Sequence, residues 1–167
     1  MTTEYFSSFP QIVYNSDTIK NITVRLDFLN RIKNNAALFQ YFILQTGQRP
    51  EDIAYAYYGD PNLYWIVLWM NDVVDPYYGW LLTDTQVYNY ALQKYTDIGA
   101  THHYEASTNA KLPIGTIVDQ YYLFPKVAIT NLAYEQAENE KKRKIKILQG
   151  TYINQVLSEY RTELSSA

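Results

Sequence analysis

Residues 49–80 read RPEDIAYAYYGDPNLYWIVLWMNDVVDPYYGW, and this segment contains all three tryptophans of the chain. Pro50 suits the first turn of a helix, because the N–H that proline lacks would have no intrahelical partner there. Gly59 ends that helix, since glycine readily takes the left-handed conformation of a helix C-terminus. Asp60 then caps a second short helix that runs to about Met70. The segment therefore predicts two consecutive helices separated by one tight break.

The second of these helices is apolar on every side. Trp65 and Trp69 lie four residues apart on one face, and aliphatic residues at helical spacing lie on another. These aliphatic residues are Leu63, Ile66, Val67 and Met70. An ordinary surface helix has one polar face, and this one has none. Either the rest of the chain encloses it or one of its faces meets a partner.

The composition favours a protein with extensive interfaces. The chain has 167 residues, enough for one domain or a small domain with extensions. It contains 18 tyrosines but only 6 phenylalanines, and tyrosine is enriched where a ring is buried on one side and wet on the other. An ordinary tyrosine-rich core is the competing explanation. The net charge of −3 argues against nucleic-acid binding, which needs a basic face.

Several other classes are also disfavoured. The chain has no cysteine, so it forms neither a disulfide framework nor a thiolate metal site. The N-terminus lacks the pattern of a signal peptide. The longest apolar run, Leu63 to Met70, is far shorter than the ~20 residues that span a bilayer. We therefore expect a soluble protein that is made in a cytoplasm, without a membrane segment or a cofactor.

The residues before this segment favour strands. Asn15–Asp17 has the composition of a hairpin turn between two apolar–polar runs. A second apolar run, Ala37–Leu44, predicts another strand. The residues that favour strands in the first part of the chain are Ile12, Tyr14, Ile22, Val24, Leu26 and Phe28.

Both helices and strands are expected after Trp80. A helix should start at Thr83 or Asp84 and run to about Tyr95, and a charged helix capped by Asn131 should reach about Arg143. Within the charged helix, Glu138 with Lys142 and Glu140 with Lys144 lie four apart, in the order that favours ion pairs. The last helix is amphipathic and spans Tyr152–Leu164. The expected strands are His102–Glu105, Ile114–Val118, Val127–Thr130 and Lys144–Ile147.

No residue pattern indicates catalysis or metal binding. His102 and His103 are adjacent, so on a strand they point to opposite faces and form a poor chelating pair. The carboxylates near residue 70 each have a capping or turn explanation, and these are Asp60, Asp72, Asp75 and Asp84. The basic cluster Lys141–Lys146 is either a solvated face or a grip for an acidic partner.

Residues 49–71 resemble a LysM-type module. In that small strand–helix–helix–strand fold, a helix ends in Tyr-Tyr-Gly, Asp-Pro-Asn follows, and a tryptophan-bearing helix ends at Asn. The corresponding positions here are Tyr57-Tyr58-Gly59, Asp60-Pro61-Asn62, Trp65 and Asn71. The resemblance implies either a peptidoglycan-binding or glycan-binding module, or a fold reused for another purpose. A small glycosidase is a third hypothesis, but no pattern in the sequence indicates which pair of carboxylates would be catalytic.

A longer pattern resembles one family more closely. Asp75-Pro76-Tyr77-Tyr78-Gly79-Trp80 follows the LysM-type residues, and Asn139-Glu140-Lys141 with Lys144-Ile145-Lys146-Ile147 comes later. Together these blocks are similar to the LysM-like baseplate wedge proteins of contractile-tailed bacteriophages. The resemblance implies a structural virion protein of the tail baseplate, with no catalytic activity and no cofactor or metal. Assembly in the host cytoplasm is expected.

The resemblance also implies partners and an organisation. The partners would be other baseplate wedge proteins and neighbouring wedges in a six-fold assembly, with the hub or sheath-initiating proteins as further candidates. The expected α+β fold has an extended β arm over residues 1–36 and a LysM-like core over 37–96. A second arm over 97–131 and C-terminal helices with a short strand over 132–167 follow. The candidate core or partner-binding residues are Trp65, Trp69, Tyr77, Tyr78, Trp80, Arg143 and Lys144.

Overall fold

The computed structural model describes residues 5–22, 32, 35, 37–108 and 110–166. It contains helices and small antiparallel sheets, which confirms the predicted α+β class. The chain forms two compact units, which we call unit 1, Met1–Trp80 with Lys144–Ala167, and unit 2, Leu81–Arg143. Unit 2 is therefore inserted in the sequence of unit 1. The division into two arms, a core and a C-terminal segment stays a prediction.

Helix α2 of unit 1 spans Pro50–Tyr58, as predicted. The backbone N–H of Arg49 donates to a carboxylate oxygen of Asp52 over 2.9 Å, which satisfies one of the free donors at the helix start. Gly59 follows the helix with φ of 74°, a left-handed conformation in which a Cβ would be strained. The local signals in the sequence thus set both ends of α2.

The second helix differs from the prediction in its first turn. Pro61–Leu63 forms a 3₁₀ turn, η2, and α3 follows over Tyr64–Met70. The Asp60 carboxylate accepts a hydrogen bond from Asn62 N at 2.9 Å, so Asp60 is the cap that the sequence predicted. Because Pro61 has no N–H, this side-chain bond holds the turn at its second residue.

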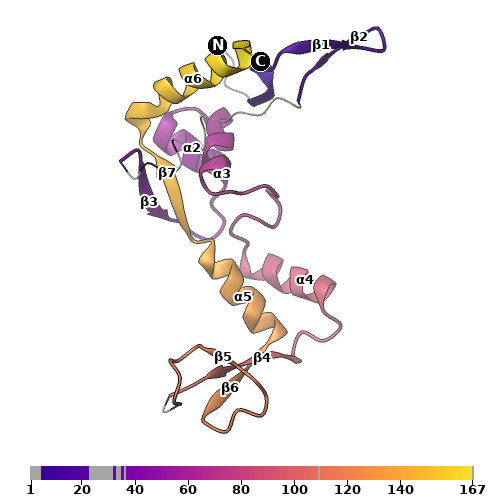
Figure 1. Ribbon diagram of the computed structural model, residues 1–167, viewed down its shortest axis with the longest axis vertical. Coiled ribbons are helices and arrows are strands. Elements are labelled where there is room, and N and C mark those ends of the chain that lie inside the picture. Colours follow the sequence, from indigo (N-terminus) through magenta and orange to yellow (C-terminus); the bar gives the residue numbers. More distant parts are fainter. Residues whose placement is uncertain (1–4, 23–31, 33–34, 36, 109, 167) are drawn as a thin grey trace. The chain divides into compact units, whose positions relative to one another are not determined.

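A two-stranded sheet packs against these helices. Strand β3, Phe39–Ile43, pairs antiparallel with β7, Lys144–Leu148, and both strands were predicted. Figure 1 shows β7 beside α2 and α3, and α3 contacts β7 directly. Fully buried side chains from α2, α3 and β7, with Leu44 directly after β3, form the core of unit 1: Leu44, Ile53, Ile66, Val67, Met70, Ile147 and Leu148.

Asn71, directly after α3, joins the helix to β7. Its Nδ2 donates to Val67 O and to Lys146 O, both at 2.8 Å, and its Oδ1 accepts from Lys146 N at 2.7 Å. One amide side chain therefore satisfies both backbone groups of Lys146 on the side of β7 that faces away from β3. This contact fixes the helix to the strand across 75 positions of sequence.

The described N-terminal residues form a 3₁₀ turn, η1, over Tyr5–Ser8, and a hairpin of β1, Gln11–Tyr14, with β2, Asp17–Lys20. Asn15 and Ser16 have φ of 48° and 70°, as in the two-residue turns that match the strand twist. The hairpin prediction is confirmed. Ile22 is wrong as a strand residue, because its N–H bonds back to Lys20 O in a turn. Val24, Leu26 and Phe28 lie outside the described residues.

Unit 1 ends with a 3₁₀ turn, η3, Gly150–Tyr152, and helix α6, Ile153–Ser166. The helix is amphipathic, as predicted. Its buried face comprises Ile153, Val156, Leu157, Tyr160 and Leu164.

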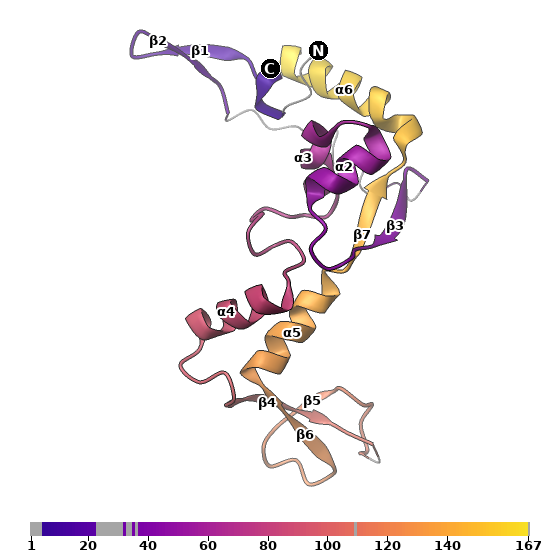
Figure 2. The same ribbon diagram turned by 180° about the vertical axis from the view of Figure 1, so that it is seen from behind.

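Unit 2 combines two helices with a three-stranded sheet. Helix α4 spans Asp84–Lys94 and is capped by Thr83, and α5 spans Asn131–Lys141. Figure 2 shows α4 beside α5, and the sheet at the start of α5. The sheet has the order β5-β4-β6, with strands Ile117–Val118, Thr101–Ala106 and Lys126–Thr130.

Asn139 on α5 has a role in unit 2 similar to that of Asn71 in unit 1. It is buried, its Oδ1 accepts from Leu82 N at 2.9 Å, and its Nδ2 donates to Leu82 O at 2.9 Å. The segment that leads into α4 is thereby held against α5. Asn71 and Asn139 both belong to the motifs that carried the family resemblance, so at least part of those motifs is structural.

Two details of α5 correct the sequence analysis. The N-cap is Thr130 rather than Asn131, because the Thr130 hydroxyl accepts from Ala133 N. Glu140 pairs with Arg143, three residues further on, and not with Lys144, which begins β7; Glu138 pairs with Lys141. The helix ends at Lys141, so the residues after it no longer follow helical spacing.

Candidate protein-binding surface

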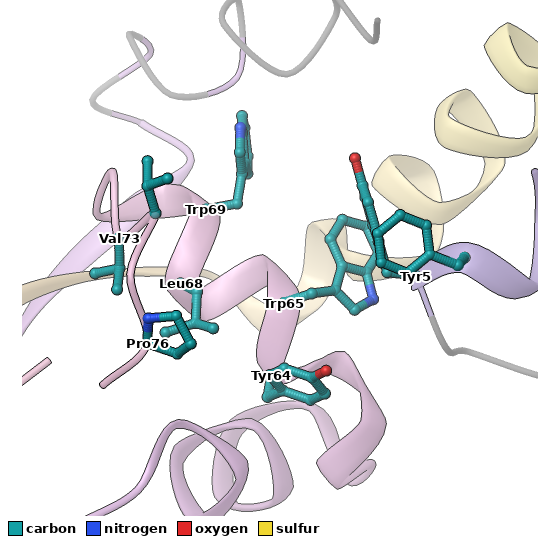
Figure 3. A pocket seen from close by; sticks show the side chains of 9 residues that line it. Tyr5, Tyr64, Trp65, Leu68, Trp69, Val73 and Pro76 are labelled. Atoms are coloured by element: carbon teal, nitrogen blue, oxygen red, sulfur yellow. The ribbon is translucent and has the colours of Figure 1, made fainter. Parts of the chain in front are cut away.

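An open apolar groove of about 380 Å³ lies along α3 in unit 1. None of the described residues that line it is charged. Figure 3 shows Trp69 and Leu68 projecting from α3 in different directions, with Val73 and Pro76 from the following segment. The described lining residues are Tyr5, Phe6, Tyr64, Trp65, Leu68, Trp69, Val73, Val74 and Pro76.

One end of the groove rests on an aromatic cluster. The ring of Trp65 lies 5.1 Å from the rings of both Tyr5 and Tyr160, and Tyr5 lies 5.1 Å from Phe9. The Tyr160 hydroxyl donates to Tyr5 O, and burial together with the neighbouring Tyr5 raises the pKa of Tyr160. The hydrogen bond from this hydroxyl connects η1 to α6. Trp65 itself is buried, so it supports the groove from beneath.

The other end leads into the DPYYGW turn. Oδ1 of Asp75 accepts from Tyr77 N at 2.9 Å, and Gly79 N donates to Asp75 O at 2.7 Å. A Cβ on Gly79 would lie 2.5 Å from Asp75 O, so this turn requires glycine. The turn leaves Tyr77 80% exposed and Tyr78 46% exposed. It then returns the chain to the core.

Trp80 is the residue that enters the core after this turn. Its ring is buried, and its Nε1 donates to Gln48 O over 2.8 Å. The structure therefore divides the predicted aromatic residues into two groups. Trp65 and Trp80 are core residues, whereas Trp69 is partly exposed and the two tyrosines of the turn are exposed.

The two predicted basic residues lie elsewhere. Arg143 ends unit 2, where its guanidinium pairs with Glu140, with Nη2 and Oε2 2.8 Å apart. That ion pair raises the pKa of Arg143. Lys144 begins β7 in unit 1, and its ammonium lies 4.1 Å from the centre of the Tyr41 ring. Neither residue contributes to the groove.

Sequence analysis missed most of the groove. Tyr5 and Phe6 come from the N-terminal turn, and nothing in the sequence indicates that this turn meets α3. Val73 and Val74 carried a usable signal, since two aliphatic residues between Asp72 and Asp75 are unusual in an exposed turn. Val74 is 94% exposed, which makes it the most exposed groove residue.

The titratable residues of unit 2 form structural contacts. Glu135 is buried on α5, and it accepts hydrogen bonds from Lys94 Nζ at 2.8 Å and from Tyr95 Oη at 2.7 Å. Burial alone would raise the pKa of Glu135, but these two hydrogen bonds outweigh it and hold the pKa below its ordinary value. Nearby, the ring of His102 stacks on Tyr134 with centres 3.9 Å apart.

In the part of the chain that the structure describes, no group of three or more histidine, aspartate or glutamate side chains is placed to hold a metal ion. The helices within those residues are too short or too polar to cross a membrane.

Comparison with known proteins points to one family. Residues 2–120 match the family model described as base plate wedge protein 53. The chain is also similar to the baseplate wedge protein gp53 of Enterobacteria phage T4. The two are 31% identical over 151 residues, which cover 80% of this chain and 76% of that protein.

Proposed function

The chain belongs to the base plate wedge protein 53 family, and we propose that it joins wedge subunits and clamps adjacent wedges through the apolar groove along α3. As a member, it is a structural protein of the phage tail baseplate. The groove is the observation that supports the proposed role in joining and clamping wedges. It offers about 380 Å³ of space, with no charged residue among its described lining, beside the partly exposed Trp69 and the exposed Tyr64.

These residue types suit a protein partner. Tryptophan and tyrosine dominate the binding energy of protein interfaces, where a few central aromatic side chains carry most of the affinity. Tyr77 and Tyr78 follow the groove residue Pro76 on a turn that Asp75 and Gly79 hold in place. A partner therefore meets aromatic rings that are already positioned, so little conformational entropy is lost on binding. The role is assembly by buried area and needs no catalysis.

The partners in this proposal are other wedge proteins and the neighbouring wedges of a six-fold baseplate, with hub or sheath-initiating proteins as further candidates. The protein would be assembled into the tail in the host cytoplasm. The exposed β1–β2 hairpin and the three-stranded sheet of unit 2 would act as arms that reach neighbours. The LysM-like character of β3, α2, α3 and β7 is part of this proposal, as a sugar-binding shape reused for assembly.

The test is incorporation of variants into phage tails. Trp69→Ala removes the partly exposed groove ring, and Val74→Asp places a charge in an apolar contact without touching the core. Both should fold and yet be absent from assembled baseplates. Tyr55→Ala is the matched control, because Tyr55 is an exposed tyrosine of α2 that does not line the groove. Normal tails from both groove variants would show that the groove is not the interface.

The alternative of a glycan-binding module has a separate test. Sugars need several polar side chains that hydrogen-bond hydroxyl and N-acetyl groups, and this groove offers mainly the hydroxyls of Tyr5 and Tyr64. Binding of the purified chain to peptidoglycan, competed by free N-acetyl sugars, would favour that alternative over an assembly role.

A further inference from the structure

Strand β3 has one edge that pairs with no strand among the residues that the structure describes, and we call it the free edge. The strand reads FQYFI, with no charge and no proline, and β7 pairs with its other edge. Figures 1 and 2 both show β7 as the single described strand beside it. Proteins usually protect such an edge with lysine, proline or a bulge, because it offers unpaired backbone groups to any extended segment.

Two hydrogen-bond contacts show which backbone groups point outward. Gln149 N donates to Leu38 O at 2.9 Å, so these two residues face each other across the sheet. Both backbone groups of Lys146 hydrogen-bond the Asn71 side chain, so they point away from β3. Tyr41, which lies opposite Lys146, therefore points its own N–H and C=O away from β7. By the alternation of an antiparallel ladder, Phe39, Tyr41 and Ile43 direct their N–H and C=O groups to the free edge.

The same three residues share one face of the sheet. On that face Tyr41 is 59% exposed and Ile43 is 53% exposed. A segment that paired with this edge would therefore gain backbone hydrogen bonds and, at every second residue, contact with an exposed apolar side chain. This combination is the usual basis of recognition by strand addition.

Charge indicates what the segment is. The Lys144 ammonium lies 4.1 Å from the centre of the Tyr41 ring, and that of Lys146 lies 4.9 Å from the Phe39 ring. Both side chains therefore lean from β7 across β3. Within the residues that the structure describes, no carboxylate is within ion-pair distance of either ammonium. A ring face attracts a cation but does not neutralise it.

We propose that β3 binds an extended acidic segment of another baseplate protein, which adds as a third strand with carboxylates at alternate positions. Lys144 and Lys146 are two residues apart, so the acidic side chains that face them on a strand are also two apart. A second copy of this chain fits less well, because pairing β3 with itself would bring two such pairs of lysines together. The inference rests on the proposed function only in that the partner is a protein of the same assembly.

The test uses the full chain and two synthetic peptides, one alternating glutamate with threonine and one alternating lysine with threonine. The glutamate peptide should shift the amide NMR signals of Phe39, Tyr41 and Ile43 and slow exchange of the Tyr41 amide. The lysine peptide should not. No shift at millimolar peptide, equal shifts from both peptides, or dimerisation of the chain through β3 would each overturn the proposal.

Two variants separate the backbone from the side chain. Tyr41→Pro removes an N–H that faces the free edge and makes no bond to β7, a position where edge strands tolerate proline. Tyr41→Thr removes the ring but keeps the N–H. Binding of the glutamate peptide should be abolished by the proline and only weakened by the threonine. Replacing Lys144 and Lys146 together by glutamine should weaken it several-fold.

The same variants distinguish this inference from the proposed function. Should Tyr41→Pro enter tails as well as Tyr41→Thr while Trp69→Ala fails, the β3 site is wrong and the groove stands. If the groove variants assemble normally while Tyr41→Pro is absent from tails, the groove is not the interface and the β3 site stands.

Discussion

Replacing Asn71 should destabilise unit 1 more than any other polar substitution on its surface. The side chain makes three hydrogen bonds, of 2.7–2.8 Å, to Val67 O and to both backbone groups of Lys146. A typical hydrogen bond contributes about 1 kcal/mol net, and a buried group left without a partner costs about 1–3 kcal/mol. Since the site is only part-buried, water replaces some of this, and Asn71→Ala should cost about 2–3 kcal/mol.

Urea denaturation followed by tryptophan fluorescence measures this loss directly. Trp65, Trp69 and Trp80 all lie in unit 1, so tryptophan fluorescence follows the unfolding of that unit and not of unit 2. With a urea dependence of about 2 kcal/mol per molar, the midpoint should fall by about 1–1.5 M. Asn71→Asp should cost at least as much at pH 7, because a charged carboxylate would then face the carbonyl oxygens of Val67 and Lys146.

Asn62→Ala is the matched control. Asn62 lies in the turn before α3 with its side chain exposed, so its loss should change stability by less than about 0.5 kcal/mol. A midpoint for Asn71→Ala within 0.2 M of the wild type would refute the reasoning. An equal shift from Asn62→Ala would also refute it, since the effect would then belong to any asparagine near α3.

Three further expectations concern other parts of the chain. Asn139→Ala should destabilise unit 2 by about 2 kcal/mol, because Leu82 loses two buried hydrogen bonds, and circular dichroism should show the loss. Because the pKa of Glu135 in the folded chain is below its ordinary value of 4.5, the ionised carboxylate stabilises unit 2 at pH values above 4.5, and this stabilisation is lost as the pH falls from 4.5 through the lowered pKa. Amide exchange of α5 should become faster over that pH range. In Glu135→Gln the exchange rates should lose this dependence on pH. Ser16→Gly should stabilise the β1–β2 hairpin by about 0.5–1 kcal/mol, because Ser16 has φ of 70°; slower amide exchange in the hairpin would confirm it.

The sequence predicted those elements whose signals are local. Pro50, Gly59 and Asp60 set the ends of α2 and the start of the next turn, and the structure has each of them in that role. Asn15 and Ser16 likewise form the predicted hairpin turn. Each of these residues acts on backbone groups within a few positions, so no knowledge of the rest of the chain is needed.

What could not be predicted depends on contacts between distant residues. Both β3 and β7 were expected as strands, but their pairing, Ile43 with Lys144, spans about 100 residues and a whole inserted unit. Asn71 was recognised only as the end of a motif, because its partner Lys146 lies beyond that insertion. The groove was missed for the same reason, since Tyr5 lies 60 positions before Trp65 of α3, and its contacts with Trp65 and with Tyr160 of the last helix are formed only in the folded chain.

The division of the aromatic residues bears on the proposed function, in which one short segment serves both stability and assembly. Trp65 and Trp80 are buried, so they hold α3 and the DPYYGW turn against the core. Because those two anchors are fixed, Trp69 and Tyr77 between them are presented at the surface on a backbone that cannot easily collapse. An isolated chain gains nothing from exposing Val74 beside them, since apolar side chains in one patch lower solubility. On the proposed function a neighbour covers the patch in the baseplate, so loss of that neighbour should leave a chain that is folded but prone to associate.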